Sequence, residues 1–276
     1  MAVSSKVVLV TGCSVGGIGS ALCEEYASQG CKVYATARRL ETMEGLKHNV
    51  ERLKLDVTSD EDVQNVVKTI IDKEGRIDVL VNNAGILCTG PVIDVPMEEI
   101  QRTYDANVFS VIRMCKAVIP HMAARKSGTI VNISSLMAHL PTPWAGIYAS
   151  TKAALQSLGD TLYMECTPFN ISVMSITTGA IRSNLATNRL ATFQGLPADS
   201  LYQRFLPNIV QRISLSQGSD RMSAEEYAKR VVPKTLQAKP PRSMILGGKS
   251  WFMLLAWLPR TPVLWLIWRM FSRGAQ

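Results

Sequence analysis

The chain has few residues that bind metals and no clustered cysteines. Its three histidines stand far apart, and its six cysteines occur singly, without a CxxC pair. This spacing provides neither a Cys/His ligand set nor a disulfide framework. We therefore expect no metal site, and cysteines that stay reduced as small apolar residues in a reducing compartment.

A targeting segment and a long apolar run are also missing. The first residues, Met-Ala-Val-Ser-Ser-Lys, lead directly into a predicted strand, so we expect no secretory signal. A helix that spans a bilayer needs about 20 apolar residues. The apolar stretches at 251–258 and 263–268 are shorter, and Pro259-Arg260-Thr261-Pro262 separates them. This pattern argues against a helix that crosses the membrane.

The chain is rich in apolar side chains and in positive charge. Of its 276 residues, 47% are hydrophobic, which is ample for a core, and its formal net charge is +8. Length alone allows one large domain or two small ones. The charge suits an anionic cofactor, a phosphate-bearing substrate or an anionic membrane surface. No basic stripe interleaved with aromatic residues occurs, so we expect no nucleic-acid partner.

The N-terminal region predicts a βαβ unit. Residues 6–11 form a continuous apolar run, typical of a strand buried on both faces. A glycine-rich turn follows, then a helical stretch at about 18–29 and a second strand at 31–37. Such a unit places a pyrophosphate at the helix N-terminus, where glycines allow close approach. The pattern therefore favours a bound nucleotide.

A tyrosine and a lysine in the stretch Tyr148-Ala-Ser-Thr-Lys152 are spaced to share one helix face. A free tyrosine has a pKa near 10, and a neighbouring ammonium lowers this pKa towards neutrality. Upstream, the β-branched run at 128–135 predicts a buried strand that ends in the hydroxyl of Ser135. Ligands bind at that edge of parallel sheets. Ser135, Tyr148 and Lys152 are therefore candidates for acid–base chemistry on one substrate.

Two further motifs complete a known order. The stretch Asn82-Asn-Ala-Gly85 follows an apolar strand at 77–81, and Asn107 lies in the stretch YDANV. A glycine-rich turn, NNAG, Asn, Ser and YxxxK in this order resemble the short-chain dehydrogenase/reductase family, from about Lys6 to Ser183. The resemblance implies an α/β fold. It would comprise a single Rossmann-type, doubly wound parallel sheet within 1–250, a helical substrate lid at about 184–241, and an apolar C-terminal tail at 251–276.

The resemblance also implies roles for the catalytic residues. Ser135 and Tyr148 would hydrogen-bond a substrate carbonyl, with Tyr148 as the proton donor. Lys152 would lower the pKa of Tyr148 and hold the ribose of a nicotinamide cofactor. Asn107 would distort its helix and hold a water that links Lys152 to solvent. Members of this family are usually dimers or tetramers, so we expect a homo-oligomer.

For the nicotinamide dinucleotide, the resemblance implies a larger set of contacts. The set comprises Gly12, Ser14, Gly17, Ile18, Gly19, Arg38, Arg39, Asp56, Val57, Asn83, Ala84, Gly85, Tyr148, Lys152, Ile181 and Ser183. The chain departs from the family pattern at two places. Gly16 is an extra residue in the glycine turn, and Thr178 replaces a proline, while Ser183 retains a hydroxyl at a threonine position.

The residues after the second strand indicate which dinucleotide is used. NAD-binding members carry an acid there that holds the ribose diol, whereas this chain has Ala37 followed by Arg38 and Arg39. A guanidinium pairs with a 2′-phosphate through charge-assisted hydrogen bonds. The sequence therefore favours NADP(H), with Arg38 as the main contact.

The substrate is less constrained by the sequence. The stretches TGCSVGGIG and YATARR and the Trp-rich tail are most similar to fungal NADPH-dependent 1-acyldihydroxyacetone-phosphate reductases. This implies reduction of a ketone on a lipophilic substrate. Fungal ketoreductases of secondary metabolism share much of the pattern, and hydroxysteroid and retinol dehydrogenases are more distant. An NADP(H)-sensing scaffold is the alternative without catalysis, although all four catalytic residues are present.

Two C-terminal features bear on the substrate and the location of the protein. We expect helices in the lid near 198–210 and 224–238. The lid also carries four arginines, Arg189, Arg204, Arg212 and Arg221. These arginines either bind a phosphate head group or form a solvated face. The Trp-rich tail suits the interface of a membrane or lipid droplet, or it covers a lipophilic substrate mouth or a dimer partner. We expect the cytosolic face of the endoplasmic reticulum or a lipid droplet, and otherwise the cytoplasm.

Overall fold

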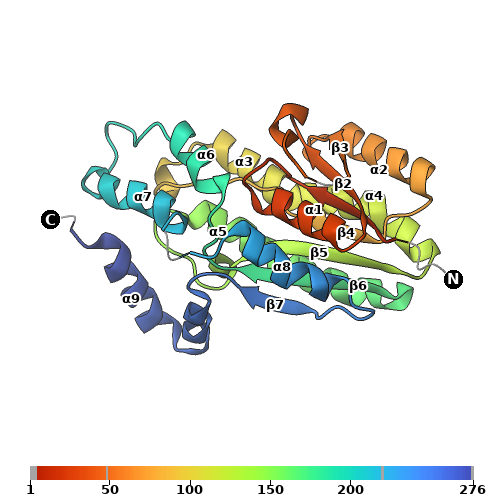
Figure 1. Ribbon diagram of the computed structural model, residues 1–276. Helices are drawn as coiled ribbons and strands as arrows, with labels where there is room; N and C mark the ends of the chain where they lie inside the picture. The colour runs from red at the N-terminus through yellow and green to blue at the C-terminus, as the bar shows by residue number, and fades with distance from the viewer. Residues whose placement is uncertain (1–4, 48, 219–220, 275–276) are drawn as a thin grey trace.

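A parallel β-sheet of seven strands forms the centre of the molecule (Figure 1). The structure, a computed structural model, describes residues 5–47, 49–218 and 221–274. The strand order is β3-β2-β1-β4-β5-β6-β7, and every neighbouring pair is parallel. The strands are β1 (Val7–Thr11), β2 (Lys32–Ala37), β3 (Val50–Lys54), β4 (Val79–Asn82), β5 (Gly128–Ser135), β6 (Ile171–Thr178) and β7 (Ser243–Leu246). The order reverses between β1 and β4, so the predicted doubly wound, Rossmann-type sheet is confirmed.

Helices cover both faces of the sheet because its central strands are apolar on both sides. In β1, Val8 and Val10 belong to the core formed with α1 (Ile18–Ser28) and α8 (Ala224–Thr235). Val7 and Leu9 belong to the core on the opposite face, formed with α2 (Asp60–Glu74), α4 (Ser110–Ala124) and α5 (Gly146–Cys166). The alternation of side chains along each strand thus produces two cores, one against each face.

Three of the remaining helices gather beyond the carboxyl ends of the strands, at the left of Figure 1. They are α6 (Asn184–Thr192), α7 (Leu206–Ile213) and α9 (Arg260–Ser272). Elsewhere, α3 (Met97–Tyr104) continues through a π turn at Asp105–Phe109 into α4. Short 3₁₀ turns cover Leu40–Met43, Val92–Asp94, Leu136–Ala138, Thr167–Phe169, Gln203–Phe205, Ser214–Ser216 and Ser250–Trp257.

The helix α8 lies elsewhere than the sequence analysis placed it. We expected it within the lid at 184–241, but it packs against α1 on the face of the sheet. Tyr227 and Val231 are fully buried there, and Tyr26 OH lies 2.6 Å from Thr235 Oγ1. An apolar stripe along one side occurs both in helices that cover a sheet and in helices of a lid. The sequence pattern alone therefore did not show to which of the two kinds α8 belongs. Within 184–241, the helices over the carboxyl end of the sheet are therefore α6 and α7.

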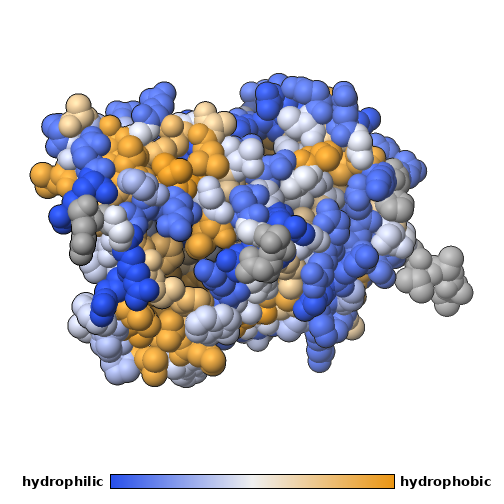
Figure 2. Space-filling view, turned by 60° about the vertical axis from the view of Figure 1, so that its left-hand side comes forward, coloured by the Kyte–Doolittle hydropathy of each residue, from blue (hydrophilic) through white to orange (hydrophobic). Residues whose placement is uncertain are grey.

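The tail folds back over the same end of the sheet. Val263 and Ile267 of α9 are buried against Leu140, and the rings of Trp268 and Trp144 lie 5.6 Å apart. The other side of the tail is exposed, to 88% for Trp257, and contributes to the apolar surface in Figure 2. Among the described helices, none combines the length and the apolar character that crossing a bilayer requires.

Candidate active site

A cavity of about 960 Å³ lies at the carboxyl edge of the sheet and brings together residues from most of the chain. It is lined by nearly all of the predicted site residues: Gly12, Ser14, Gly17, Ile18, Arg38, Arg39, Asp56, Val57, Asn83, Ala84, Gly85, Ser135, Tyr148, Lys152, Ile181 and Ser183. Gly19 and Asn107 do not line it but pack directly behind lining residues. The edge of the sheet is the location that the strand order predicts for a ligand.

The glycine turn after β1 is held in place by the NNAG segment after β4. The Asn83 side chain donates to the carbonyl oxygens of Thr11 at 2.8 Å and Gly12 at 3.0 Å. A Cβ on Gly19 would lie 2.4 Å from the Gly12 oxygen, so only glycine fits there. Asn83 therefore positions the turn through its side chain, and because it also lines the cavity, its predicted contact with the cofactor stays a prediction.

The extra residue of the glycine turn, Gly16, lies against the start of α6. Gly16 has a φ of +82°, a conformation that favours glycine, and a Cβ there would lie 3.0 Å from the Asn184 amide. The Asn184 Nδ2 donates to the Val15 carbonyl at 2.6 Å. The lengthened turn thus contacts Asn184, the first residue of α6.

Two arginines lie at the end of β2. Arg38 and Arg39 are exposed at the cavity rim. Arg39 lies 3.8 Å from Glu41, a weak exposed pair, whereas Arg38 forms no ion pair within the part of the chain that the structure describes. Beside them, the Ser14 hydroxyl donates to Thr42 Oγ1 at 3.1 Å. An exposed guanidinium beside hydroxyl groups fits a phosphate.

Asp56 lines the cavity as Arg38 and Arg39 do, and one of its carboxylate oxygens accepts hydrogen bonds from the protein. Its Oδ1 accepts from the Thr58 amide at 2.9 Å and from the Thr58 hydroxyl at 2.7 Å. Burial raises the pKa of Asp56, but the hydrogen bonds from Thr58 and the charges of Arg38 and Arg113 outweigh burial and hold the pKa below its ordinary value. The carboxylate therefore stays ionised and can accept from an amino group such as that of adenine.

Ser135 and Tyr148 meet in the centre of the cavity. Ser135 ends β5, where its Cα partner in the register is Thr178 of β6, and Tyr148 lies in the first turn of α5. Both side chains are buried, each 9% exposed. Burial raises the pKa of the Tyr148 phenol, while a hydrogen bond with Ser135 and the charge of Arg212 act in the opposite direction. A buried phenol beside a hydroxyl can donate a proton to a bound carbonyl.

Lys152 lies one turn further along α5, on the face that it shares with Tyr148. Its ammonium is 5.7 Å from the centre of the Tyr148 ring and donates to the Ile133 carbonyl at 3.0 Å. Burial lowers the pKa of Lys152 to about 8. The predicted Tyr–Lys juxtaposition is therefore present. That Lys152 lowers the pKa of Tyr148 stays a prediction, because the cation that acts on this pKa in the structure is Arg212.

Asn107 lies in the π turn between α3 and α4, as expected for a residue that distorts its helix. Its amide exchanges hydrogen bonds with the backbone of Ile86, at 2.8 and 3.0 Å, and donates to Thr151 Oγ1 at 3.0 Å. A Cβ on Gly85 would lie 3.0 Å from Asn107 Oδ1 and 3.8 Å from the Lys152 nitrogen. Asn107 thus fixes the loop after β4 against α5, and its predicted link to water stays a prediction.

The segment after β6 closes the cavity between its two ends. Thr178, which replaces the family's proline, is buried and shares a 2.7 Å hydrogen bond with Tyr227 OH of α8. Ile181 is buried beside the cavity, and Ser183 precedes α6 without using its hydroxyl as a cap. Ser183 lines the cavity, and its expected contact with the cofactor amide stays a prediction.

One residue beside Tyr148 in the cavity was not among the predicted catalytic residues. Arg212 of α7 lines the cavity, is 9% exposed, and is close enough to Tyr148 for the two charges to affect each other. The sequence places Arg212 among the four arginines of the predicted lid, and their spacing gives no reason to prefer it. Its neighbour Tyr148 is distant in the sequence, so no local pattern links the two residues.

Apolar residues line much of the cavity away from the glycine turn, and the tail supplies some of them. Its walls include Leu140, Ile213, Phe252, Ile267 and Phe271. Figure 2 shows this face of the molecule, where apolar side chains gather on both sides of a hollow. The tail therefore contributes part of the cavity wall, and the expected roles of the tail at a substrate mouth, a membrane interface or a dimer partner stay predictions.

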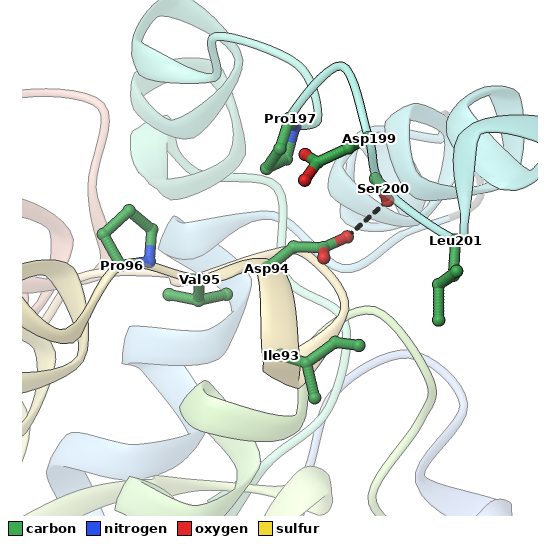
Figure 3. Close-up of a pocket in the computed structure, with 8 residues that line it drawn as sticks. All are labelled: Ile93, Asp94, Val95, Pro96, Pro197, Asp199, Ser200 and Leu201. Carbon is green, nitrogen blue, oxygen red and sulfur yellow. Dashed lines mark hydrogen bonds between the residues drawn. The ribbon is translucent and has the colours of Figure 1, made fainter.

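A smaller pocket of about 370 Å³ lies on the outside of the lid (Figure 3). It is formed by residues 93–96 before α3 and by Pro197, Asp199, Ser200 and Leu201 from the loop after α6. The Ser200 hydroxyl donates to Asp94 Oδ2 at 2.6 Å. This pocket holds none of the predicted site residues, and its hydrogen bond ties the lid loop to the body of the protein.

Comparisons with known proteins agree with this arrangement. The family model described as short chain dehydrogenase matches residues 6–193. A Schizosaccharomyces pombe protein named NADPH-dependent 1-acyldihydroxyacetone phosphate reductase is 34% identical over 255 residues, which cover 91% of this chain and 82% of that protein. A Penicillium crustosum protein named short-chain dehydrogenase PC-15 is 39% identical over 231 residues, which cover 82% and 83% of the two chains.

A solved structure supports the same assignment. The crystal structure of a short-chain dehydrogenase from Streptomyces avermitilis matches with a TM-score of 0.81 and 32% identity, and the match covers 100% of both chains. The match of the family model extends over more than half of the sequence. The chain therefore belongs to the short-chain dehydrogenase/reductase family and is an oxidoreductase that uses a nicotinamide cofactor.

Proposed function

We propose that the protein uses NADPH to reduce a ketone on a lipophilic substrate to a secondary alcohol, with 1-acyldihydroxyacetone phosphate as the candidate substrate. The observation that carries the proposal is the convergence of Ser135, Tyr148 and Lys152 in one cavity with a dinucleotide end and an apolar end. Side chains positioned for proton transfer and a site for a hydride carrier are what carbonyl reduction requires.

The dinucleotide end fits NADPH better than NADH. Arg38 and Arg39 stand at the rim, and Ala37 occupies the position where an acid would repel a 2′-phosphate. Asp56 would accept from the adenine amine, and the glycine turn would receive the pyrophosphate. When bound, the nicotinamide would supply the hydride that reduces the carbonyl carbon. The NADPH dependence of the S. pombe relative supports this preference.

The protein's own residues would handle the proton. Tyr148, kept protonated by burial, would donate to the carbonyl oxygen, and Ser135 would stabilise the charge that develops there by a hydrogen bond. Lys152 would hold the ribose hydroxyl groups of the nicotinamide. The backbone rearrangement at Asn107 would leave room for a water that returns a proton towards Lys152.

The apolar end of the cavity and the exposed side of the tail support a lipid-like substrate taken from a membrane or lipid-droplet surface. Phe252, Ile267 and Phe271 line the cavity, whereas Trp257 and Trp265 of the same segment are exposed. Tryptophan and flanking arginine are typical of segments that lie in a membrane interface. The expected location at the endoplasmic reticulum or a lipid droplet and the expected homo-oligomer remain predictions.

A ketone panel tests the proposed function. Purified protein is mixed with NADPH or NADH, and the nicotinamide absorbance is followed with 1-acyldihydroxyacetone phosphate, a 17-ketosteroid, retinal or an aromatic polyketide-like ketone. We expect NADPH oxidation with the acyl phosphate and much slower oxidation of NADH. Turnover of only the polyketide-like ketone would place the protein in secondary metabolism. Tight NADPH binding without turnover of any ketone would contradict the proposed reaction.

A further inference from the structure

Arg212 is a buried cation whose partners are a hydroxyl, a thioether sulfur and the ring of Phe271, whose centre lies 5.7 Å from its Cζ. Its Nε donates to Thr142 Oγ1 at 2.8 Å, and its Nη2 lies 2.6 Å from the Met137 sulfur. The Nη1 group makes no hydrogen bond, and no carboxylate lies within ion-pair distance, among residues 5–47, 49–218 and 221–274. A thioether is a poor acceptor, and a buried guanidinium without an anion is costly because it loses its hydration.

The other arginines of the predicted lid are engaged differently. Arg189 also lines the cavity, but its Nη1 lies 2.7 Å from Glu99, and its Nε and Nη2 donate to Thr89 at 2.8 Å. Arg204 is exposed and stacks on the ring of Phe205, and Arg221 donates to the Leu215 carbonyl. Arg212 is therefore the member of this set whose charge is directed at the cavity without a protein anion.

The position of Arg212 places this charge beside the reacting centre. Arg212 and Tyr148 line the same cavity and affect each other's ionisation. Burial lowers the pKa of Arg212 to about 10, so the guanidinium remains charged at neutral pH. Two carboxylates line the cavity, Asp56 and Asp105. Asp56 lies at the dinucleotide end, and Asp105 is paired with Arg113.

We propose that Arg212 determines specificity by binding an anionic group, a phosphate or carboxylate, that the substrate carries close to its ketone. This inference rests on the proposed ketone reduction and adds the chemical class of the substrate. A guanidinium binds such oxygens through two parallel charge-assisted hydrogen bonds, which would replace the contact with the Met137 sulfur. The apolar chain of the substrate would then lie against Phe252, Ile267 and Phe271 of the tail.

A matched pair of ketones tests the inference. One is 1-hexanoyl-dihydroxyacetone phosphate, and the other is the same ketone without its phosphate. We expect the wild-type protein to prefer the phosphate in kcat/KM by about 10- to 100-fold. Arg212→Met should abolish this preference, because turnover of the phosphate-bearing ketone should fall about 10- to 100-fold further than turnover of the neutral one. Arg212→Lys should restore part of it, and Arg204→Met, an exposed lid arginine, should leave it intact.

An equal loss on both ketones in Arg212→Met would overturn the inference, because it would show that Arg212 acts through Tyr148 or through the fold. A wild-type protein that reduces neither ketone would contradict the proposed function instead. Calorimetric titration of the products separates the two failures. We expect wild-type protein with NADP⁺ to bind hexanoylglycerol 3-phosphate at least about 10-fold more tightly than hexanoylglycerol, and Arg212→Met to bind them equally. Equal binding by the wild type would also refute the role of Arg212.

Discussion

Two cations approach Tyr148 from different parts of the fold, and burial affects both. Lys152 reaches it from the same helix and Arg212 from α7, and burial lowers the pKa of Lys152 to about 8 and that of Arg212 to about 10. Below pH 8 both are therefore charged. Burial raises the pKa of Tyr148, so the phenol is protonated in the same range, as an acid in ketone reduction must be.

This arrangement predicts the pH dependence of the reaction. We expect kcat/KM for ketone reduction to fall as the pH rises through about 8, because Lys152 loses its proton and the local positive charge decreases. A pH–rate profile from pH 6 to 10 measures it. Lys152→Arg, whose guanidinium stays charged, should move the decline to higher pH. A rate that increases from pH 7 to 9 would show that Lys152 is not the group that controls the reaction.

At the level of single residues, the sequence predicted the position of those active-site residues whose placement depends on local spacing. Tyr148 and Lys152 share a helix face because they are four residues apart, and Ser135 could be placed because it ends an apolar strand. Arg212 could not be distinguished from Arg189, because the acid that neutralises Arg189, Glu99, lies on a different helix. The difference between a paired and an unpaired buried charge depends on long-range packing.

At the level of elements, Trp144 joins the loop after β5 to the lid and the tail. Its ring lies 5.1 Å from Phe205, at the start of α7, and 5.6 Å from Trp268 of α9. Its Nε1 donates to the Phe271 carbonyl at 3.3 Å, and its own carbonyl accepts from Gly90. The residue has a φ of +68°, unusual for a bulky side chain, which the surrounding packing maintains.

Trp144→Ala should therefore loosen α7 and α9 together. We expect the free energy of unfolding to fall by about 3 kcal/mol, and the KM for the ketone to rise while the affinity for NADPH is retained. Urea unfolding and cofactor titration measure these effects. The matched control is Trp257→Ala, since Trp257 is 88% exposed and should change stability by no more than about 0.5 kcal/mol. Similar destabilisation by both variants would contradict the joining role of Trp144.

The elements that the sequence predicted well are those specified by their own residues. The βαβ unit follows from an apolar strand, a glycine turn and a helix in succession, and the parallel direction of the strands follows from repeating that unit. The extent of the lid could not be predicted from the sequence, because the apolar face of α8 could pack against either the sheet or the lid. Contacts with Tyr26 and with Thr178 settle its place, and both residues are far from α8 in the sequence.

For the whole molecule, the tail has two sides with different surroundings. The inner side, with Ile267 and Phe271, closes the cavity, and the outer side exposes Trp257 and Leu254. Arg269 stacks on Trp265, 4.7 Å from the ring centre. A surface of this composition suits contact with anionic lipid, which would bring a lipophilic ketone to the mouth of the cavity.

Trp257→Glu tests this membrane contact. We expect it to weaken binding to phosphatidylserine-containing vesicles by about 10-fold, because a charge replaces a buried indole in the interface. Turnover of a water-soluble ketone should be unchanged, since Trp257 does not line the cavity. Leu201→Glu is the control, because Leu201 is 80% exposed on the lid, outside the tail. If both variants sediment with vesicles like the wild type, the outer side of the tail does not bind membrane.

The central claim is that Tyr148 donates the proton in an NADPH-dependent ketone reduction. The most direct measurement compares wild-type protein with Tyr148→Phe, using a ketone that the wild type reduces. NADPH oxidation is followed by absorbance, and NADPH binding by fluorescence titration. The account predicts that turnover falls by at least about 100-fold while NADPH binding is retained. Turnover by Tyr148→Phe within about 10-fold of the wild type would contradict it.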